Sequence, residues 1–450
     1  MERKLVIIGS GPSGMQCAIS ATEQGVLAKD ILIIERETTL GGTINQSNHQ
    51  NFGHPKYGNN LTGPQLAEKM AKKIKKLGIE YITDSTVLSF DKNKQIKVVS
   101  PKYGYCIIQA EAIVLAMGCR EKSKGALTIT GTRPEGVLSA GTMQRLINVD
   151  KYLPGKRTVV LGSANIALFV ARRIELAGGT VVCVCEPKKY SDGSEENIKK
   201  CLENNNIPLN YSYIVNKIFG DKCVEAVEIS KANERGRAIK NTGEVVECDS
   251  FVYSCGLVPE NELSKSAGIV LDRRSEGPKV NQYLETSVRG IFACGNVLRI
   301  HDLLTFIIEE GEIVGKNVAK YLIDPVEKPK KKVRLLNGER ILYTVPQRLD
   351  IDEEGIVGET VYFRVNGKYD NIVLHVSCDG KTVYKRKKGK MSSMQTGKIL
   401  IDEELAKKIA NATEVIVYAT DKKSSSKKAN KEIVHKKLKK SKKIKKGIAK

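Results

Sequence analysis

Three glycines near the N-terminus, Gly9, Gly11 and Gly14, stand in the order G-x-G-x-x-G after the apolar run KLVII. The first glycine permits a tight turn, the second lets the backbone approach a pyrophosphate, and the third lets a helix pack on the strand. Glu35 follows 21 residues after Gly14, at the end of the run ILIIE, where an acid can bind ribose hydroxyls. The spacing therefore predicts a dinucleotide site with its phosphates at the positive end of a helix.

A second copy of this pattern begins at Arg157, in RTVVLGSANIALFVARRIELAGG. Gly162 keeps the first glycine, but Ala164 stands at the second position and Ala167 at the third. The methyl group of Ala164 would intrude on the path of a pyrophosphate, whereas alanine is permitted at the third position. Glu186 lies 19 residues after Ala167, where an acid favours NAD by binding the 2′-hydroxyl and repelling a 2′-phosphate. The segment is either a working nicotinamide site or a sheet that only scaffolds the first half.

Histidine and cysteine provide the other side chains that could react. Among the five histidines, His49, His54 and His301 are candidate acids or bases, with a structural or surface role as the equal alternative for each. The eleven cysteines include no C-x-x-C pair, so neither a disulfide framework nor a metal site is indicated. Reduced, mostly buried thiols are expected, with Cys183 and Cys185 pointing to one buried face of a strand.

Strands and helices alternate through most of the chain, which predicts an α/β fold with parallel sheets. The two βαβ segments start about 150 residues apart, so two nucleotides are expected. Residues 323–333 combine prolines with lysines and predict a linker. Beyond them the apolar period changes to two, in TVYFRV, NIVLHVSC and EVIVYA, which predicts a small β domain over 334–420.

The net charge of +23 is concentrated at the C-terminus. Residues 422–450 contain fourteen lysines and one glutamate, a net +13, which leaves +10 for the first 421 residues. A solvated tail is favoured, and the alternative is a helix on an anionic surface, without specific recognition of nucleic acid. No apolar run reaches the ~20 residues of a membrane span. Because the first strand starts close to the initiator methionine, no secretory signal is predicted and a cytoplasmic protein is expected.

Several segments together resemble the two-dinucleotide-binding flavoproteins of the pyridine nucleotide-disulfide oxidoreductase superfamily. They are the first glycine turn, LGG at 40–42, AMG at 116–118, the second βαβ segment, CGLVP at 255–259 and TSVRGIFACGNV at 286–297. AMGCREKSKGA, GVLSAGTMQRLIN, NELSKSAGI and ACGNVLRIHDLL more narrowly resemble a bacterial group of NAD(P)/FAD-dependent oxidoreductases. Members are often encoded beside anaerobic glycerol-3-phosphate dehydrogenase-like proteins, and the α subunits of opine oxidases and amino-acid dehydrogenases are cousins. The resemblance reaches about residue 420.

The resemblance implies FAD on the first βαβ segment and a nicotinamide dinucleotide on the second, with NAD expected rather than NADP. An FAD-binding domain would comprise residues 1–120 and 286–325, interrupted by an NAD-binding domain at 121–285. The expected cofactor-binding residues are Gly9, Gly11, Pro12, Ser13, Gly14, Glu35, Arg36, Gly42, Thr43, Val87, Ala116, Gly118, Gly162, Ala164, Asn165, Glu186, Gly256, Gly295 and Asn296.

Some of these positions carry a more specific expectation. By resemblance, Glu35 would lie at the adenosine ribose, the backbone of Val87 at the adenine, and Gly42 with Thr43 near the pyrophosphate and the flavin. Asn296 stands where the superfamily usually has an aspartate on the ribityl chain or pyrophosphate. An amide can donate and accept a hydrogen bond there, but it adds no charge.

The helix that begins near Leu303 would point its N-terminus at the flavin pyrimidine ring. His301 or backbone N–H groups would stabilise the negative charge that a reduced flavin accumulates there. His49 and His301 are therefore the candidate catalytic residues.

The segment after LGG reads LGGTINQSNHQNFG and contains no cysteine, although disulfide reductases of this fold need a redox pair beside the flavin. Ser47 stands where the narrower group has a single cysteine. The expected function is hydride transfer between NAD(H) and FAD, with electrons passing to or from a second substrate or partner dehydrogenase without a thiol relay. One alternative is a direct flavin dehydrogenase or oxidase of a small metabolite with a vestigial NAD site. Another is a non-catalytic FAD-bound subunit.

Overall fold

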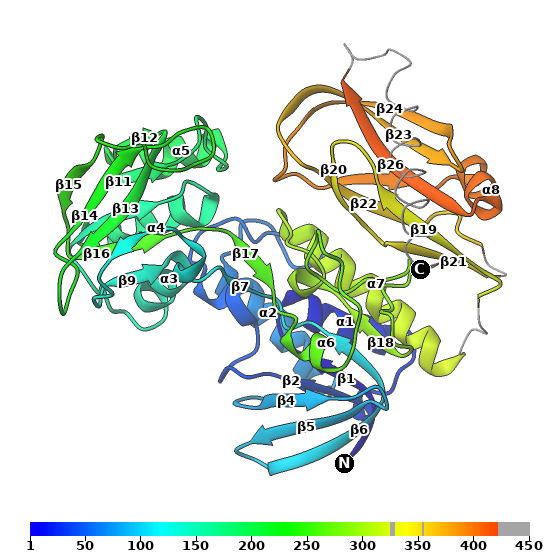
Figure 1. Ribbon diagram of the computed structural model, residues 1–450. Coiled ribbons are helices and arrows are strands. Elements are labelled where there is room, and N and C mark those ends of the chain that lie inside the picture. The colour runs from blue at the N-terminus through cyan, green and yellow to red at the C-terminus, as the bar shows by residue number, and fades with distance from the viewer. Residues whose placement is uncertain (325–328, 353–354, 422–450) are drawn as a thin grey trace, which may run out of the picture. The chain divides into compact units, whose positions relative to one another are not determined.

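The computed structural model describes residues 1–324, 329–352 and 355–421 (Figure 1). The chain divides into two compact units, which are Met1–Ala267 with Cys294–Leu322, and Gly268–Ala293 with Ile323–Lys450. The lysine-rich tail at 422–450 and part of the predicted linker lie outside the described residues.

A largely parallel sheet begins the first unit. Its strands run in the order β3 (Glu80–Ile82), β2 (Ile31–Ile34), β1 (Glu2–Ile8), β6 (Gly104–Leu115), β5 (Gln95–Ser100) and β4 (Thr86–Phe90). The first four strands pair in parallel, and β5 and β4 are added antiparallel. All four residues of β2 and the last four of β1 are buried, as expected for strands covered on both faces.

Helices α1 (Pro12–Glu23), α2 (Gly63–Lys76) and α7 (Leu304–Ile323) belong to the same part of the unit. Helix α7 approaches α1 closely, because a Cβ placed at Gly311 would lie 2.4 Å from the backbone oxygen of Ser13. The chain that follows β18 (Ile291–Ala293) is thus brought back against the helix that starts at the first glycine turn.

A second parallel sheet lies in the same unit. Its strands run in the order β12 (Leu209–Tyr211), β11 (Thr180–Glu186), β10 (Arg157–Leu161), β16 (Ser250–Tyr253) and β9 (Val137–Ser139). All of its pairings are parallel. The helices of this part are α3 (Ala140–Asn148), α4 (Asn165–Leu176) and α5 (Glu195–Cys201), whereas α6 (Glu262–Ser266) contacts β4 of the first sheet. The predicted α/β fold with two parallel sheets is confirmed.

Smaller elements complete the first unit. A four-stranded sheet has the order β15 (Glu244–Glu247), β14 (Ala226–Lys231), β13 (Tyr213–Phe219) and β8 (Thr130–Gly131). A ribbon pairs β7 (Cys119–Glu121) with β17 (Leu257–Pro259). The short 3-10 helices are η1 (Ala28–Asp30), η2 (Gly42–Gln46), η3 (Lys124–Ala126), η4 (Glu203–Asn205) and η5 (Gly295–Val297).

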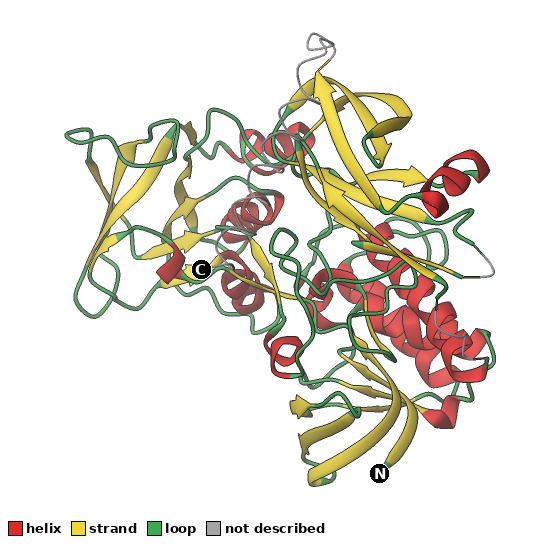
Figure 2. Ribbon diagram, turned by 45° about the vertical axis from the view of Figure 1, so that its right-hand side comes forward, coloured by secondary structure: helices red, strands yellow, loops and turns green. Residues whose placement is uncertain are grey.

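The second unit is built mainly of strands (Figure 2). One sheet has the order β21 (Arg348–Ile351), β19 (Lys331–Asn337), β26 (Glu414–Asp421), β23 (Tyr369–Cys378) and β24 (Lys381–Met391). A second sheet has the order β20 (Ile341–Val345), β22 (Thr360–Val365) and β25 (Gly397–Leu400). Helix α8 (Glu403–Asn411) and strand β18 (Ile291–Ala293) also belong to this unit. The predicted C-terminal β domain is therefore present.

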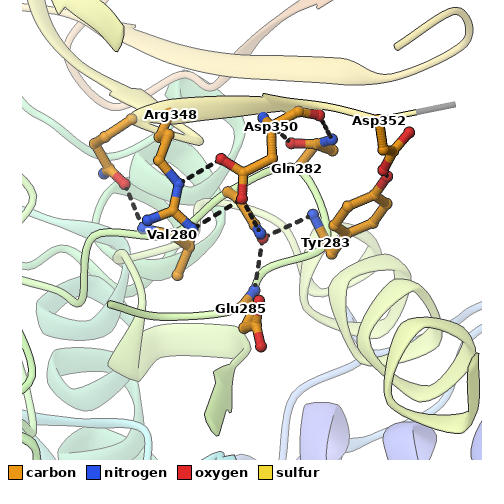
Figure 3. A network of polar contacts seen from close by, with 9 residues as sticks. Val280, Gln282, Tyr283, Glu285, Arg348, Asp350 and Asp352 are labelled. Atoms are coloured by element: carbon orange, nitrogen blue, oxygen red, sulfur yellow. Dashed lines mark hydrogen bonds and ion pairs between the residues drawn. The ribbon is translucent and has the colours of Figure 1, made fainter. Parts of the chain in front are cut away.

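Segment Gly268–Ala293 joins the second unit through a polar network (Figure 3). The Gln282 side chain donates to the backbone oxygen of Asp350 at 2.6 Å and accepts from its backbone N–H at 2.9 Å. The Asp350 carboxylate accepts from the amide of Asn281 at 3.0 Å and pairs with Arg348 at 2.7 Å. The domain boundary predicted after residue 285 runs through this segment.

Within the described ranges, none of the helices combines the length and the apolar character that crossing a bilayer requires.

Candidate functional site

The first glycine turn joins β1 to α1. The backbone N–H of Gly9 donates to the oxygen of Ile34 at 2.8 Å, which ties the turn to β2. Gly9 has a φ of +103°, and a Cβ there would lie 2.5 Å from the oxygen of Ala116. A Cβ at Gly14 would lie 2.1 Å from the oxygen of Gly9. The chain itself therefore requires glycine at both positions, and the backbone of Ala116 lies against the turn at Gly9.

Gly11 is different, because nothing in the chain requires a glycine there. Its φ of −60° suits any residue, and a Cβ would meet no atom within 4 Å. This open space lies at the N-terminus of α1, where backbone N–H groups attract anions. Gly42 borders it, since a Cβ on Gly42 would lie 3.2 Å from the Cα of Gly11. The cradle fits the pyrophosphate of a dinucleotide.

Glu35, at the end of β2, is buried and holds the turn through three hydrogen bonds. Its Oε2 accepts from the backbone N–H of Ser10 at 2.8 Å and from the Ser10 hydroxyl at 2.6 Å. Its Oε1 accepts from the backbone N–H of Glu37 at 2.9 Å. A carboxylate accepts about four hydrogen bonds, so one position remains for a ribose hydroxyl. The supporting role of Glu35 was not predicted from the sequence.

Three other residues of the predicted FAD site lie in the segments that follow β2. The backbone N–H of Ser85 donates to the backbone oxygen of Glu35 at 2.9 Å. This hydrogen bond brings the start of β4, which contains Val87, near the end of β2. The Arg36 side chain is exposed and lies 4.0 Å from the Glu37 carboxylate. Thr43 is exposed in η2.

The second turn repeats the first. Glu186 Oε2 accepts from the Ser163 backbone N–H at 3.0 Å and from its hydroxyl at 2.6 Å, while Oε1 accepts from the Lys188 N–H at 3.0 Å. Gly162 has a φ of +98°. Ala164 is the residue before α4, in the place that Gly11 occupies before α1. The second turn thus has the hydrogen bonds of the first, with a methyl group at the position where the first turn has Gly11.

Two further residues of the predicted nicotinamide site are less tightly defined. The side-chain oxygen of Asn165 accepts from the backbone N–H of Ser194 at 3.1 Å and from the Asn197 amide at 3.0 Å, so it is tied to the start of α5. Gly256 is exposed, has a φ of +93°, and a Cβ there would meet nothing within 4 Å.

Segment Gly295–Val297 lies against the first turn. Gly295 has a φ of +75°, and a Cβ there would lie 2.4 Å from the Ser13 hydroxyl. Asn296 Oδ1 accepts from the His301 backbone N–H at 3.0 Å and lies 3.0 Å from His301 Nδ1. The structure therefore brings two predicted residues, Asn296 and His301, into contact beside the first glycine turn.

Behind them lies a buried ion cluster. Glu310 Oε1 lies 2.7 Å from Arg299 and 2.9 Å from His301 Nε2, and the other oxygen accepts from the Gly295 N–H at 3.0 Å. Burial would raise the pKa of the Glu310 carboxyl, but the positive charges of His301 and Arg299 lower it to about 2. Arg299 and Glu310 were not predicted from the sequence. The available signal was the presence of an arginine and a glutamate in apolar surroundings.

The matching family model describes the pyridine nucleotide-disulphide oxidoreductases and covers residues 3–313. The chain belongs to this family. It is accordingly a flavoprotein oxidoreductase of the general FAD-dependent, NAD(P)H-linked class.

Curated relatives of this family are distant. An NADH oxidase of Methanocaldococcus jannaschii is 26% identical over 260 residues, which are 54% of each chain, so this chain spans about half of that relative. A thioredoxin reductase of Listeria innocua is 25% identical over 323 residues, 71% of this chain and 93% of the relative.

Solved structures show the same fold. Thioredoxin reductase from T. acidophilum matches with a TM-score of 0.58 at 19% identity, over 72% of this chain and 99% of that one. An NAD-dependent persulfide reductase from A. fulgidus matches with a TM-score of 0.54 at 18% identity, over 86% and 70%.

Within this family fold, His49 and His54 have structural contacts. The His49 ring stacks on Phe169 of α4 at a centroid distance of 3.7 Å, and burial together with Lys200 lowers its pKa to about 4. His54 Nδ1 accepts from the Lys56 N–H at 3.2 Å within a turn. The structure brings neither of them into contact with Asn296 or His301 through a described hydrogen bond.

The thiols of this family member are free, and several are buried. Burial raises the pKa of Cys17 and Cys294 well above that of an ordinary thiol, and it raises the pKa of Cys119 to about 11. Cys183 and Cys185 lie in a hydrophobic core with their sulfurs 3.9 Å apart, on one face of β11 as predicted. Cys17, Cys119 and Cys294, whose pKa values are raised, therefore carry little thiolate.

Proposed function

We propose that this chain transfers a hydride between NAD(H) and FAD and exchanges electrons with a second substrate or a partner dehydrogenase without a thiol relay. The observation that carries the proposal is the composition of η2. This element borders the open space at Gly11 and contains no sulfur in Gly42–Gln46. Bound FAD would supply the hydride-accepting group, and the chain would supply its placement and electrostatics.

The residues that would hold FAD are those around the first turn. The N-terminus of α1 and the backbone of Gly11 would bind the pyrophosphate, and Glu35 would bind the ribose with its remaining acceptor position. Asn296 would contact the cofactor from segment Gly295–Val297, which lies against the first turn.

The nicotinamide cofactor is proposed to be NADH rather than NADPH. Glu186 would repel a 2′-phosphate, and the nearby cations are already engaged. Lys188 pairs with Asp192, and Lys189 lies 3.3 Å from Glu234. These pairs reduce the positive charge that a 2′-phosphate would need. Faster flavin bleaching by NADPH than by NADH would overturn this choice.

One experiment separates the proposal from its alternatives. The purified yellow protein is mixed anaerobically with NADH, NADPH or glycerol 3-phosphate, and the visible flavin band is followed. Bleaching by NADH supports the proposal. Bleaching by glycerol 3-phosphate alone would indicate a direct dehydrogenase and would support kinship with the group found beside glycerol-3-phosphate dehydrogenase-like proteins. A flavin that no donor reduces would indicate a non-catalytic subunit.

The lysine-rich residues 422–450 are proposed to be dispensable for the chemistry, as a solvated tail would be. The alternative role, binding to anionic surfaces, would draw on their net charge of +13. Truncation after Asp421 is expected to leave flavin reduction intact and to weaken binding to anionic liposomes, most at low salt. Equal liposome binding by both forms would refute the surface role.

A further inference from the structure

Strand β24 forms one edge of the larger sheet of the second unit (Figure 1). Its backbone pairs with β23, and among the described residues no other strand pairs with it. The strand at the opposite edge, β21, is covered, because the Gln282 side chain forms two hydrogen bonds with the backbone of Asp350. The N–H and C=O groups on the outer side of β24 are therefore open to a partner strand.

The side chains of β24 are strongly basic. Its eleven residues include no acid and six cations, which are Lys381, Lys385, Arg386, Lys387, Lys388 and Lys390. Five of the six are exposed, and Lys388 is half-buried. In the part of the chain that the structure describes, none of the six forms an ion pair. The positive charge of this edge is therefore available to an acidic partner.

The ionisable groups beside this charge respond to it. Burial and the charge of Arg386 lower the pKa of Lys388. Burial and the charge of Lys385 likewise lower the pKa of His375 on β23. Each cation thus makes a second positive charge nearby less favourable, and a bound carboxylate would relieve this repulsion.

The cations occupy both faces of the strand. Lys385 and Lys387 lie on one face of the sheet. Arg386, between them, lies opposite Leu374 of the hydrophobic core and therefore belongs to the other face. A flat anionic membrane would meet the cations of one face only, whereas an extended chain that lies along the edge reaches both.

We propose that the outer side of β24 is a docking edge for an acidic, extended segment of a partner protein, which adds to the sheet as a further strand. Backbone hydrogen bonds to the open edge would give affinity, and Asp or Glu side chains beside the cations would give specificity. The same charge excludes β24 of a second copy, because like charges directly opposite each other destabilise a strand pair. A nucleic acid would match the charge but not the edge, since its backbone lacks the alternating donors and acceptors of a strand.

The test measures how tightly the full chain binds a fluorescent peptide of alternating glutamate and valine. A peptide of the same length with alternating glutamate and proline has the same charge but cannot form a strand ladder, since proline lacks the N–H group. Fluorescence anisotropy measures both affinities at low and at high salt.

Two variants of equal charge locate the binding surface. The β24 variant carries Lys385→Gln, Arg386→Gln and Lys387→Gln. The matched control loses two exposed lysines and one exposed arginine elsewhere in the second unit, through Lys332→Gln, Arg334→Gln and Lys407→Gln. Because all six side chains are exposed, both variants should unfold in urea as the wild-type protein does.

The wild-type chain should bind the glutamate–valine peptide about tenfold more tightly than the glutamate–proline peptide, because only the first can form the ladder. The β24 variant should bind the glutamate–valine peptide about tenfold more weakly than the wild-type chain, since three ion pairs are lost. Lys387→Gln alone should weaken binding by about twofold. The control variant should retain the wild-type affinity, and high salt should reduce the effect of the β24 variant.

Equal affinity of the wild-type chain for the two peptides would show attraction by charge alone and would overturn strand addition. An unchanged affinity in the β24 variant, or an equal loss in the control variant, would place the binding elsewhere and would also overturn the proposal. Tighter binding of oligothymidylate or of phosphatidylserine vesicles, lost in the β24 variant, would assign the edge to a nucleic acid or a membrane instead. Each of these outcomes would leave the proposed flavin chemistry standing.

Discussion

The two glycine turns of the first unit share their internal hydrogen bonds and differ at the residue that precedes the helix. In each, a buried glutamate accepts from the backbone and hydroxyl of a serine, with hydroxyl distances of 2.6 Å at both Ser10 and Ser163. At the residue before the helix, the first turn has Gly11 and the second has Ala164. The glutamates therefore hold the turns in either case. We therefore expect the residue before the helix, rather than the glutamate, to decide whether a phosphate can bind.

The strongest test of this comparison is Gly11→Val. The φ of −60° and the open space around a Cβ predict that the apoprotein folds normally. The branched side chain would fill the cradle, so FAD affinity should fall by a factor of about 100 or more, which corresponds to about 2.7 kcal/mol. Purified protein should be colourless, as judged by its visible spectrum.

Ala164→Val is the matched control for this variant, since it adds the same side chain at the equivalent position of the second turn. It should remain yellow. A Gly11→Val protein that retains flavin would contradict the assignment of FAD to the first turn.

The next test replaces the two glutamates. In Glu35→Gln and in Glu186→Gln, one carboxylate oxygen becomes an amide donor that faces N–H and O–H groups. Charge-assisted hydrogen bonds contribute about 1.5–3 kcal/mol, so each variant should lose about 2 kcal/mol of unfolding free energy. Urea unfolding of the apoprotein measures this.

Only Glu35→Gln should also weaken FAD binding, because Glu186 belongs to the second turn. If Glu186→Gln left stability unchanged, the supporting role inferred for both acids would fail. Equal loss of FAD in the two variants would contradict the assignment of the cofactor to the first turn.

The sequence predicted the two turns well and the supporting network poorly, for a physical reason. Gly9 and Glu35 act within one βαβ segment, so local spacing reveals them. The contact between His301 and Glu310 depends on how α7 starts, and the stacking of His49 on Phe169 depends on the packing of distant segments. Gln282 joins β21 through hydrogen bonds that carry no periodic signal. The C-terminal β domain was visible because its strands alternate.

A smaller effect is expected from Ala164→Gly. If the methyl group obstructs the nicotinamide dinucleotide, its removal should tighten NADH binding by a factor of 3 to 10, or about 0.7–1.4 kcal/mol. Titration with NADH, followed by flavin fluorescence or calorimetry, measures the change. FAD content is the internal control and should not change. Weaker binding of NADH would show that the second turn accommodates the alanine and that its methyl group contributes a contact.

The smallest effect is expected from the cysteines. Each turn is followed by thiols in its own segment, with Cys17 in α1 and Cys183 with Cys185 in β11. Burial holds the pKa of Cys17 high, and the hydrogen bond between Cys183 and Cys185 raises the pKa of Cys185 and lowers that of Cys183. Cys17 and Cys185 therefore carry little thiolate, and Cys183 is enclosed in the hydrophobic core. Replacing Cys17, Cys119, Cys183, Cys185 and Cys294 one at a time by alanine or serine should cost some packing energy. The rate of flavin reduction by NADH should stay within about twofold of the wild-type rate, because in the proposed route the hydride reaches flavin without sulfur. Alkylation with iodoacetamide should likewise leave this rate unchanged. Stopped-flow absorbance measures the rate, and urea unfolding separates a folding defect from a chemical one.

A single substitution that permits reduction by NADH but abolishes turnover with every acceptor would reveal a thiol relay. The first turn would then work as in the disulfide reductases, and the comparison between the two turns would have to include the sulfur that each one carries.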